Sequence, residues 1–362
     1  EITASHNPID YNGMKIVKSK SRPLDNIKDF QVIKALANSS KSKVSSQKGQ
    51  IRDISKNARN KYVDKIVSFI DLDNIKPIKI VVNSGNGAAG PTLDSIVDRL
   101  EKSGVPISFI RMHHRPDSTF PNGIPNPLLH ETQSITGKTV LSEDADMGVA
   151  FDGDFDRCFF FDNKGKFVPS EYIISLLASV FLSREKASRI VHDRRAIWNI
   201  EEMVLSYGGS TIQSKIGHVY FKKEMRDHQA IYGGEISAHH YFRDFAYCDS
   251  GMIPWLIIAE LISMTRLSLY ELIKNRSNLF KTSGEINFVV DDASVAIDKV
   301  LKDYRPKAIA LDETDGVSLS FTDWRFNLRK SNTEPLIRLN LETRGRKEDL
   351  ARHVEAITAI LK

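Results

Sequence analysis

The sequence has little of what marks several protein classes. Among its 362 residues are only two cysteines, Cys158 and Cys248, which lie far apart and without the spacing of a metal-binding motif. This excludes a disulfide-stabilised scaffold, and we expect reduced thiols in an intracellular protein. The longest apolar stretch, residues 252–264, is too short to cross a bilayer and contains Pro254 and Glu260. We therefore expect neither a disulfide framework nor a membrane span.

A strong charge of one sign is also missing. The 51 basic and 46 acidic residues give a net charge of +5, and no long basic block stands out. Dispersed basic residues without interleaved aromatics argue against nucleic-acid binding, whereas a mild positive excess fits a small anionic substrate. A composition of 41% hydrophobic and 27% charged residues excludes collagen-like and wholly disordered chains. The length predicts two or three domains.

Strand and helix patterns alternate along most of the chain. Residues 78–82 are typical of a buried strand, and a glycine-rich turn, a helix over 91–102 and a strand over 107–112 follow. Such alternation indicates mostly parallel α/β sheets. A second region of this kind covers residues 171–232. From about residue 282 the pattern changes to strands with two helices, which predicts a smaller α+β domain.

The glycine-rich turn matches a well-known motif only in part. Gly85, Gly87 and Gly90 satisfy G-x-G-x-x-G between a strand and a helix, as in dinucleotide-binding folds. That motif also needs an acidic residue about 20 positions later, where this chain has Ile110 and Arg111. We therefore favour a tight turn with close helix–strand packing, and a turn that binds phosphate is the alternative.

Three carboxylates alternate directly after the apolar strand 147–151. Asp152, Asp154 and Asp156 stand at the carboxyl end of a predicted parallel strand, where ligands bind in open α/β sheets. Three oxygen donors so close together repel one another unless a cation lies among them, and they leave positions open for a substrate phosphate on Mg²⁺. An EF-hand is excluded because Arg157 occupies the position that requires glycine. The segment predicts a magnesium site.

Three more polar segments are candidates for chemistry. In TASHNP, Ser5 is a possible nucleophile, but adjacent residues of an extended segment point in opposite directions, so the neighbouring histidine is no implied base. In GGEISAHH, Glu235 and Ser237 lie on one side, as sugar-binding groups would. The two histidines there suggest zinc, but no third ligand follows at the usual spacing, so we favour hydroxyl contacts. RKSNTEP is either a phosphate cradle or a charged turn between strands.

Together, a metal site, a nucleophile, hydroxyl-binding groups and an anion cradle indicate phosphosugar chemistry. The segments TASHNP, DGDFDR, GEISAHHYF and RKSNTEP resemble, in order and sequence, those of the α-D-phosphohexomutase superfamily. The resemblance implies a multidomain α/β architecture with mixed sheets and a C-terminal α+β, TATA-box-binding-like domain. It divides the chain into residues 1–58, 59–167, 168–280 and 281–362. The first range corresponds to only part of a first domain, so we expect an upstream portion to be missing.

Carried over by position, the resemblance implies a role for each segment. Ser5 matches the phosphoserine, His6 a supporting neighbour, Lys15 a general acid or base, and Arg157 the arginine beside the metal. The implied Mg²⁺ ligands are the phosphate of Ser5 and Asp152, Asp154 and Asp156. The implied sugar and phosphosugar contacts in the third domain are Arg195, His218, Glu235, Ser237 and His239. The implied phosphate loop comprises Arg329, Ser331, Asn332, Thr333 and Arg338.

The implied activity is the interconversion of mannose 6-phosphate and mannose 1-phosphate through a hexose 1,6-bisphosphate, feeding GDP-mannose and surface polysaccharide synthesis. Mg²⁺ and the bisphosphate are the expected cofactors. We expect a cytoplasmic monomer or weak dimer that binds neither nucleic acid nor membrane. Ile236 is close in size to the methionine of mannose and glucose mutases, so a phosphoglucomutase or dual-specific enzyme is the alternative. A catalytically inactive phosphosugar-binding relative is the non-enzymatic alternative.

Overall fold

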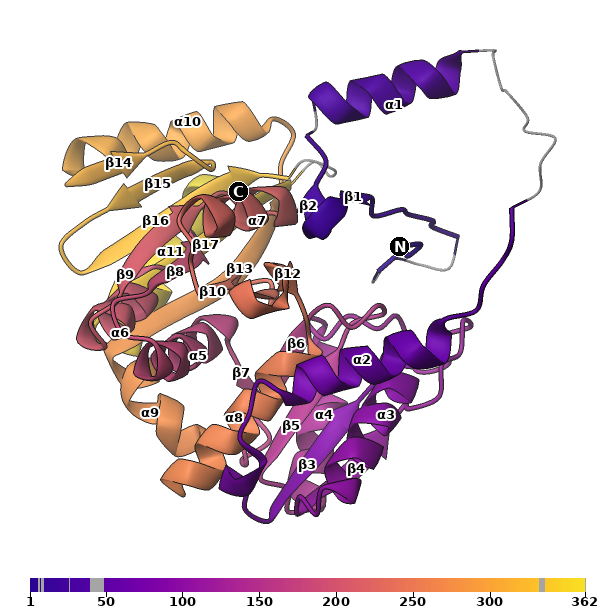
Figure 1. Ribbon diagram of the computed structural model, residues 1–362. Helices are drawn as coiled ribbons and strands as arrows, with labels where there is room; N and C mark the ends of the chain where they lie inside the picture. The colour runs from indigo at the N-terminus through magenta and orange to yellow at the C-terminus, as the bar shows by residue number, and fades with distance from the viewer. Residues whose placement is uncertain (6, 8–9, 26, 40–48, 332–335, 362) are drawn as a thin grey trace.

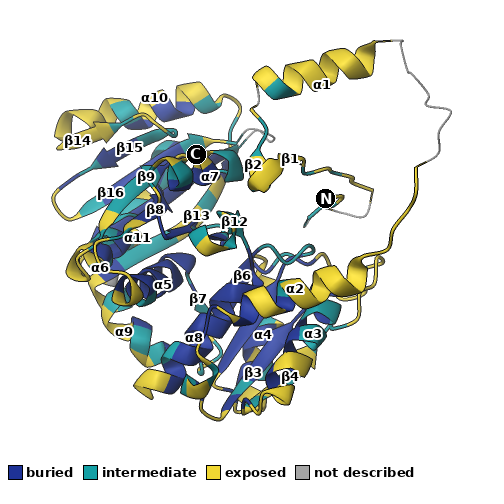
Figure 2. Cartoon of the chain, in the orientation of Figure 1, coloured by how far each residue is buried: buried dark blue, intermediate teal, exposed yellow. Residues whose placement is uncertain are grey.

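The computed structural model describes residues 1–5, 7, 10–25, 27–39, 49–331 and 336–361. Three five-stranded sheets follow one another along the chain, and a small N-terminal segment precedes them (Figure 1). In that segment, β1 (Val17–Lys18) pairs with β2 (Arg22–Pro23), and α1 (Lys28–Asn38) follows. No residue of α1 is buried against the described part of the chain (Figure 2). The boundaries expected at residues 58, 167 and 280 remain predictions.

The first large sheet has the order β4-β3-β5-β6-β7, with β4, β3 and β5 parallel and the last two strands antiparallel. Buried β-branched residues form its centre, and alternate side chains serve opposite faces. Ile80 and Val82 face the core that contains α3, whereas Val81 packs with Val140 of α4. The elements are α2 (Ser55–Val67), β3 (Ile78–Asn83), α3 (Ala89–Lys102), β4 (Ile107–Met112), α4 (His130–Ser142), β5 (Met147–Phe151), β6 (Cys158–Phe161) and β7 (Phe167–Val168).

The second large sheet has the order β12-β11-β10-β8-β9, and β10, β8 and β9 are parallel. Helix α7 covers one face through Phe221 and Met225, and α5 lies against the other. The elements are α5 (Ser170–Arg184), β8 (Arg189–Asp193), α6 (Trp198–Ser206), β9 (Ser210–Ser214), α7 (His218–Asp227), β10 (Tyr232–Gly234), β11 (His240–Phe242), β12 (Cys248–Asp249), α8 (Met252–Thr265) and α9 (Leu269–Leu279).

Helix α8 joins the cores of these two sheets. Apart from Glu260 and a few hydroxyl side chains it is apolar around its whole circumference, and most of it is buried (Figure 2), which is the pattern of a helix enclosed within a protein. Trp255 on α8 is fully buried and meets Phe109 of the first sheet edge to face at 5.8 Å. Within the described residues, no single helix reaches the length and apolarity of a membrane span. Only α8 and α9 taken together do, and they are bent by 97°.

The C-terminal sheet, β13-β17-β16-β15-β14, is antiparallel throughout. Period-two alternation divides its central strands into an apolar face, with Phe326 and Leu339, and a polar face, with Arg325 and Glu342. The apolar face packs against α10 and α11. The elements are β13 (Phe280–Val289), α10 (Ala293–Tyr304), β14 (Ala310–Asp312), β15 (Val317–Ser320), β16 (Trp324–Lys330), β17 (Leu336–Arg344) and α11 (Lys347–Leu361). Three-residue 3₁₀ helices lie at Ser19–Ser21, Leu72–Asn74, Arg243–Phe245 and Arg305–Lys307.

Candidate active site

Three acidic side chains converge in the loop after β5. One oxygen from each of Asp152, Asp154 and Asp156 lies within 4.8 Å of the others. Asp154 Oδ1 is buried and has no hydrogen-bond partner among the residues that the structure describes. Carboxylate oxygens at this spacing, one of them lacking a donor, fit a hard divalent cation such as Mg²⁺. The three aspartates that we expect to bind magnesium therefore form a single cluster.

The glycine-rich turn after β3 supports this loop from behind. A Cβ atom on Gly87 would lie 2.6 Å from the carbonyl oxygen of Gly153, and one on Gly153 would lie 2.2 Å from that of Ser5. The backbone of Ala88 also donates a hydrogen bond to Gly153 O at 2.9 Å. Three segments are thus stacked backbone against backbone, which only glycine at the two inner positions allows. The glycine-rich turn therefore serves close backbone packing, in agreement with the interpretation from the sequence.

Cations neutralise the acidic cluster on two sides. Arg157 Nε lies 2.7 Å from Asp152 Oδ2, and Lys15 Nζ lies 3.0 Å from Asp154 Oδ2 and 2.8 Å from Asp156 Oδ2. Burial raises the pKa of Asp152 to about 6, against the opposing effect of Arg157. Burial opposes the charge on Lys15, but Asp156 and Asp154 outweigh it and raise its pKa. The ammonium of Lys15 thus takes the place of a cation on these carboxylates.

Ser5 faces the acidic cluster. Its backbone adopts a left-handed conformation, with φ of 54°, and its Oγ lies 3.4 Å from Asp152 Oδ2. Thr3, which the sequence reasoning missed, ties the two loops together: its Oγ1 accepts from Ser5 N at 2.9 Å and donates to Asp154 Oδ2 at 3.0 Å. The expected nucleophile and metal ligands therefore lie side by side. His6 lies outside the described residues.

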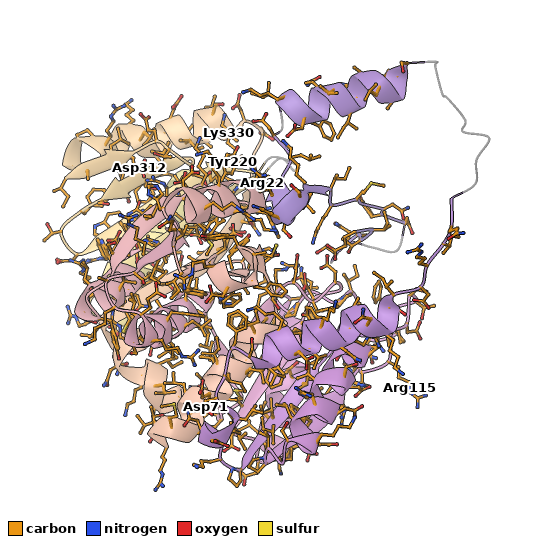
Figure 3. The ribbon with its side chains drawn as sticks, in the orientation of Figure 1. Arg22, Asp71, Arg115, Tyr220, Asp312 and Lys330 are labelled. Atoms are coloured by element: carbon orange, nitrogen blue, oxygen red, sulfur yellow. The ribbon has the colours of Figure 1, made fainter. Side chains whose placement is uncertain are left out.

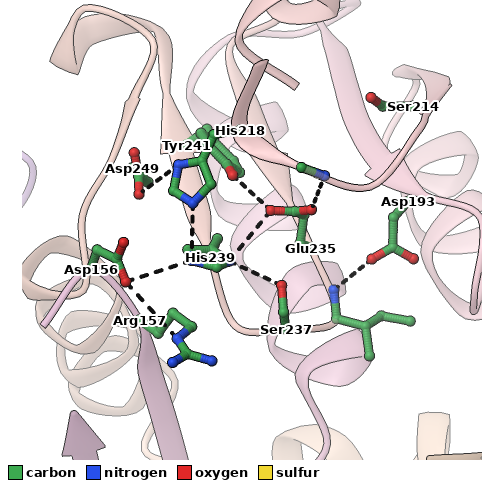
Figure 4. A network of polar contacts seen from close by, with 12 residues as sticks. Asp156, Arg157, Asp193, Ser214, His218, Glu235, Ser237, His239, Tyr241 and Asp249 are labelled. Carbon is green, nitrogen blue, oxygen red and sulfur yellow. Dashed lines mark hydrogen bonds and ion pairs between the residues drawn. The ribbon is translucent and has the colours of Figure 1, made fainter. Parts of the chain in front are cut away.

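The segment after β10 reaches the same cluster from the second sheet (Figure 4). Glu235 is buried, and its carboxylate accepts from Gly217 N at 2.8 Å and Tyr241 Oη at 2.7 Å. His239 Nδ1 lies 3.0 Å from Ser237 Oγ, and its Nε2 lies 3.5 Å from Asp156 Oδ1. These contacts bring the expected sugar-binding residues onto the acidic cluster. Tyr241 was missed because its partner comes from an antiparallel turn, which no local spacing predicts.

His218 begins α7 and turns its ring toward His239. The two Nε2 atoms are 3.2 Å apart, and His218 Nδ1 lies 3.3 Å from Asp249 Oδ2 (Figure 4). Burial opposes the charge on His239, but Asp156 and then Glu235 raise its pKa. Asp249 is a further residue that the sequence reasoning missed. It belongs to β12, an edge strand of two residues with no motif of its own.

The expected phosphate-binding arginines lie where the second sheet meets the C-terminal sheet. Buried Arg195 pairs with Asp193 at 2.7 Å and with Glu285 at 3.3 Å, and Arg338 pairs with Glu285 at 3.5 Å. Burial, and then the charge of Arg195, lowers the pKa of Arg329. These arginines therefore share one electrostatic environment. Ser331 N donates to Leu336 O at 2.8 Å, whereas Asn332 and Thr333 lie outside the described residues.

Asp193 links the arginines to the sugar-binding segment. It accepts hydrogen bonds from Ile236 N at 2.8 Å and from Arg195 N at 2.9 Å. Burial opposes the charged form of Asp193, but Arg195 outweighs it and lowers the carboxyl pKa. Nearby, Arg194 pairs with Asp312 of β14, whose position is labelled in Figure 3. One contiguous network thus runs from Ser5 through the acidic cluster and Glu235 to the arginines.

Models of three domains of one family match the chain. They are the phosphoglucomutase/phosphomannomutase α/β/α domain II at residues 60–165, α/β/α domain III at 169–280 and the C-terminal domain at 285–360. The chain belongs to this phosphoglucomutase/phosphomannomutase family. The resemblance to the phosphohexomutases and the expected α/β architecture with a C-terminal α+β domain are both confirmed.

Individual relatives agree with this assignment. The chain is 52% identical to a phosphomannomutase of Salmonella montevideo, covering 95% of this chain and 76% of the relative. It is 46% identical to a phosphohexose mutase of Xanthomonas campestris, covering 100% and 79%. Among solved structures, a phosphoglucomutase/phosphomannomutase family protein of Burkholderia thailandensis superposes with a TM-score of 0.82 at 28% identity, covering 100% and 75%.

Proposed function

We propose that the protein is a phosphomannomutase that interconverts mannose 6-phosphate and mannose 1-phosphate through a phosphorylated Ser5 and a hexose 1,6-bisphosphate. The observation that carries this proposal is the 3.4 Å approach of Ser5 Oγ to Asp152, within a carboxylate cluster that also touches the sugar-binding segment. Relatives of 48–52% identity carry the name phosphomannomutase. The chain would act in the cytoplasm as a monomer or weak dimer, and its product would supply GDP-mannose for surface polysaccharides.

The residues around Ser5 would have two roles: to hold the metal ion beside the phosphoryl group, and to provide a base for the attacking sugar hydroxyl. Asp152, Asp154 and Asp156 would hold Mg²⁺ together with the Ser5 phosphate, and the bound ion supplies charge neutralisation for the transferring phosphoryl group. Lys15 keeps its proton while its ammonium lies on two of these carboxylates. Away from them, that stabilisation is lost and its pKa falls toward the range of a general base. Lys15 is thus the candidate that deprotonates the attacking sugar hydroxyl.

The remaining residues would hold the sugar phosphate in either orientation. Glu235 is fixed by Gly217 N and Tyr241 Oη, so its carboxylate is preorganised to accept from sugar hydroxyls. Arginine forks suit the phosphate that does not react, because they bind oxygen pairs in a plane. The proposed substrate-binding residues are Arg195, His218, Glu235, Ser237, His239, Arg329, Ser331, Asn332, Thr333 and Arg338, with Arg157 and His6 supporting catalysis.

A second candidate activity is the corresponding reaction of glucose phosphates. The relatives of 46% identity in Xanthomonas campestris are named phosphohexose mutases, a name that does not restrict the sugar. An inactive sugar-phosphate-binding protein is the non-enzymatic candidate. Turnover of mannose 1-phosphate and glucose 1-phosphate, measured with Mg²⁺ and catalytic bisphosphate, ranks the two substrates. Binding without any turnover would contradict the enzyme proposal.

Phosphoenzyme formation tests the role of Ser5. Ser5→Ala should abolish incorporation of labelled phosphate from the bisphosphate and leave the circular dichroism spectrum unchanged. Ser39→Ala is the matched control, since Ser39 is exposed and its hydroxyl donates to Leu36 O at the end of α1. Labelling that persists in Ser5→Ala would show that another residue is the nucleophile.

A further inference from the structure

The two histidines of the active site, together with Asp156, have the arrangement of a second metal site. One donor atom from each of Asp156, His218, His239 and Asp249 lies within 4.8 Å of the others. We propose that His218 Nε2, His239 Nε2 and Asp156 Oδ1 bind a transition-metal ion, Zn²⁺ above all, next to the magnesium cluster. The third ligand comes from the preceding sheet, which is why spacing around the two histidines does not reveal it.

The spacing of the donor atoms fits such an ion. His218 Nε2 and His239 Nε2 are 3.2 Å apart, and His239 Nε2 lies 3.5 Å from Asp156 Oδ1. Zinc binds imidazole nitrogen and carboxylate oxygen at about 2.0–2.2 Å in tetrahedral geometry, which separates neighbouring ligand atoms by about 3.3–3.5 Å. Asp156 Oδ1 is buried and has no hydrogen-bond partner in the described part of the chain. Two of the three separations between the proposed ligand atoms therefore already match a tetrahedral zinc site.

The opposite nitrogen of each imidazole ring already has an acceptor. His218 Nδ1 lies 3.3 Å from Asp249 Oδ2, and His239 Nδ1 lies 3.0 Å from Ser237 Oγ and 3.4 Å from Glu235 Oε2 (Figure 4). Metal-binding histidines typically donate this second N–H to a carboxylate or similar acceptor, which fixes the ring and its tautomer. Asp249 is itself held by Lys222 at 2.9 Å. The groups that would orient both imidazole rings for metal binding are therefore already in place.

The two metal sites differ in donor chemistry and share one carboxylate. Asp156 Oδ2 faces Lys15 and the aspartate cluster, at 2.8 Å from Lys15 Nζ, whereas Oδ1 faces His239. An all-oxygen cluster favours Mg²⁺, while two imidazoles and a carboxylate favour Zn²⁺, Co²⁺ or Ni²⁺. Asp156 can therefore bridge both ions, and excess Mg²⁺ does not by itself occupy the histidine site.

The consequence for activity rests on the proposed function. A metal on His218 and His239 occupies two proposed sugar-phosphate contacts, so zinc should inhibit the mutase at saturating Mg²⁺. The binding itself is measured without turnover. Should zinc bind at this site and leave turnover unaffected, the proposed roles of these histidines would be wrong, but the metal site would stand.

Cobalt provides the spectroscopic probe. The full chain, carrying Cys248→Ser so that the nearby thiol cannot contribute, is titrated with Co²⁺ in millimolar Mg²⁺. We expect intense visible d–d absorption that saturates at one equivalent and is abolished by Zn²⁺. His218→Ala and His239→Gln should each weaken binding at least about 10-fold, since even residues that only hydrogen-bond to a metal ligand change metal affinity by about 10–100-fold. Asp249→Asn should weaken it within that range.

Two controls separate this site from its surroundings. His228→Ala removes a histidine just after α7 whose Nε2 pairs with Glu224 at 3.3 Å, and it should leave the Co²⁺ spectrum unchanged. Asp154→Asn removes a magnesium ligand that is absent from the histidine site, and it should retain the spectrum. Circular dichroism confirms that each variant is folded. Absorption that survives both histidine substitutions, or that disappears in Asp154→Asn, would overturn the proposal and place the ion on the aspartate cluster.

Discussion

A buried ion pair on the polar face of the C-terminal sheet should contribute strongly to stability. Arg325 and Glu342 are 3% and 1% exposed, and their charged groups are 2.8 Å apart. Glu342 also accepts from Ile197 N at 2.9 Å and Trp198 N at 3.2 Å, at the start of α6. Arg325 donates to the carbonyl of Arg194 at 3.0 Å. The pair therefore fastens the segment that carries Arg195.

The substitution Glu342→Gln should destabilise the folded protein. The amide keeps nearly the same shape, but it leaves the Arg325 guanidinium uncompensated and directs an NH₂ group toward backbone donors. Breaking a buried pair by neutralising one partner costs about 3–5 kcal/mol. We expect Glu342→Gln to lose stability in that range, measured by urea unfolding, and to lower the calorimetric Tm.

The double variant Arg325→Met/Glu342→Leu distinguishes an ion pair from mere packing. The double variant removes both charges together. Its loss in free energy of unfolding should therefore be smaller, by at least about 1.5 kcal/mol, than the summed losses of Arg325→Met and Glu342→Leu measured separately. The matched control is Glu202→Gln, which removes the charge of the exposed Glu202 that pairs with Arg276 at 2.8 Å and should cost less than about 1 kcal/mol. The reasoning fails if Glu342→Gln costs no more than Glu202→Gln.

Three further variants probe other parts of the structure. Gly87→Ala should lower both Tm and Mg²⁺ affinity, since its Cβ would lie 2.6 Å from Gly153 O, whereas Gly49→Ala, whose Cβ would meet no atom of the described residues within 4 Å, should change neither. Ser268→Ala removes the capping box of α9 and should cost about 1 kcal/mol in urea unfolding. Burial lowers the pKa of His192, so the unfolded chain binds a proton that the folded protein excludes, and stability falls as pH drops below about 6.5. His192→Asn should flatten that slope of Tm against pH; an unchanged slope would contradict this.

The parts of the site that follow directly from strand ends were predictable from sequence. Asp152, Asp154 and Asp156 follow β5, and Glu235 follows β10, so the rule that ligands bind at the carboxyl ends of parallel strands locates both. The glycine turn was also interpreted correctly, because the missing acidic residue excluded a dinucleotide. Functional side chains that directly follow a predicted strand can therefore be recognised from a single sequence.

Contacts between elements left no such signal. Nothing in the spacing of His218 and Asp249 shows that α7 and β12 bring their side chains to 3.3 Å. The same holds for the 3.5 Å contact of His239 with Asp156, which decides whether the histidine pair has a third ligand. Helix α1 shows the converse case, because it forms a regular helix although none of its residues is buried against the described part of the chain. Local patterns predict elements, and tertiary packing decides their partners.

The interface of the C-terminal sheet with the rest of the protein is more polar than the interface between the first two large sheets, and this difference favours movement of the C-terminal sheet. One continuous apolar core joins the first two large sheets, whereas the C-terminal sheet has a separate core of its own. It contacts the rest largely through hydrogen bonds, such as Tyr172 Oη to Phe280 O at 2.6 Å and Ile216 N to Asp315 at 2.9 Å. Water can replace such partners, whereas exposing an apolar core costs about 25 cal/mol per Å². The Arg325–Glu342 pair lies within the C-terminal sheet, but its hydrogen bonds to Arg194, Ile197 and Trp198 cross this boundary and would be exchanged for water on opening. In the proposed reaction, the bisphosphate turns over between two phosphoryl transfers, so the site must open. Opening at this polar boundary, beside Arg329 and Arg338, requires less free energy than separating the apolar core of the first two sheets.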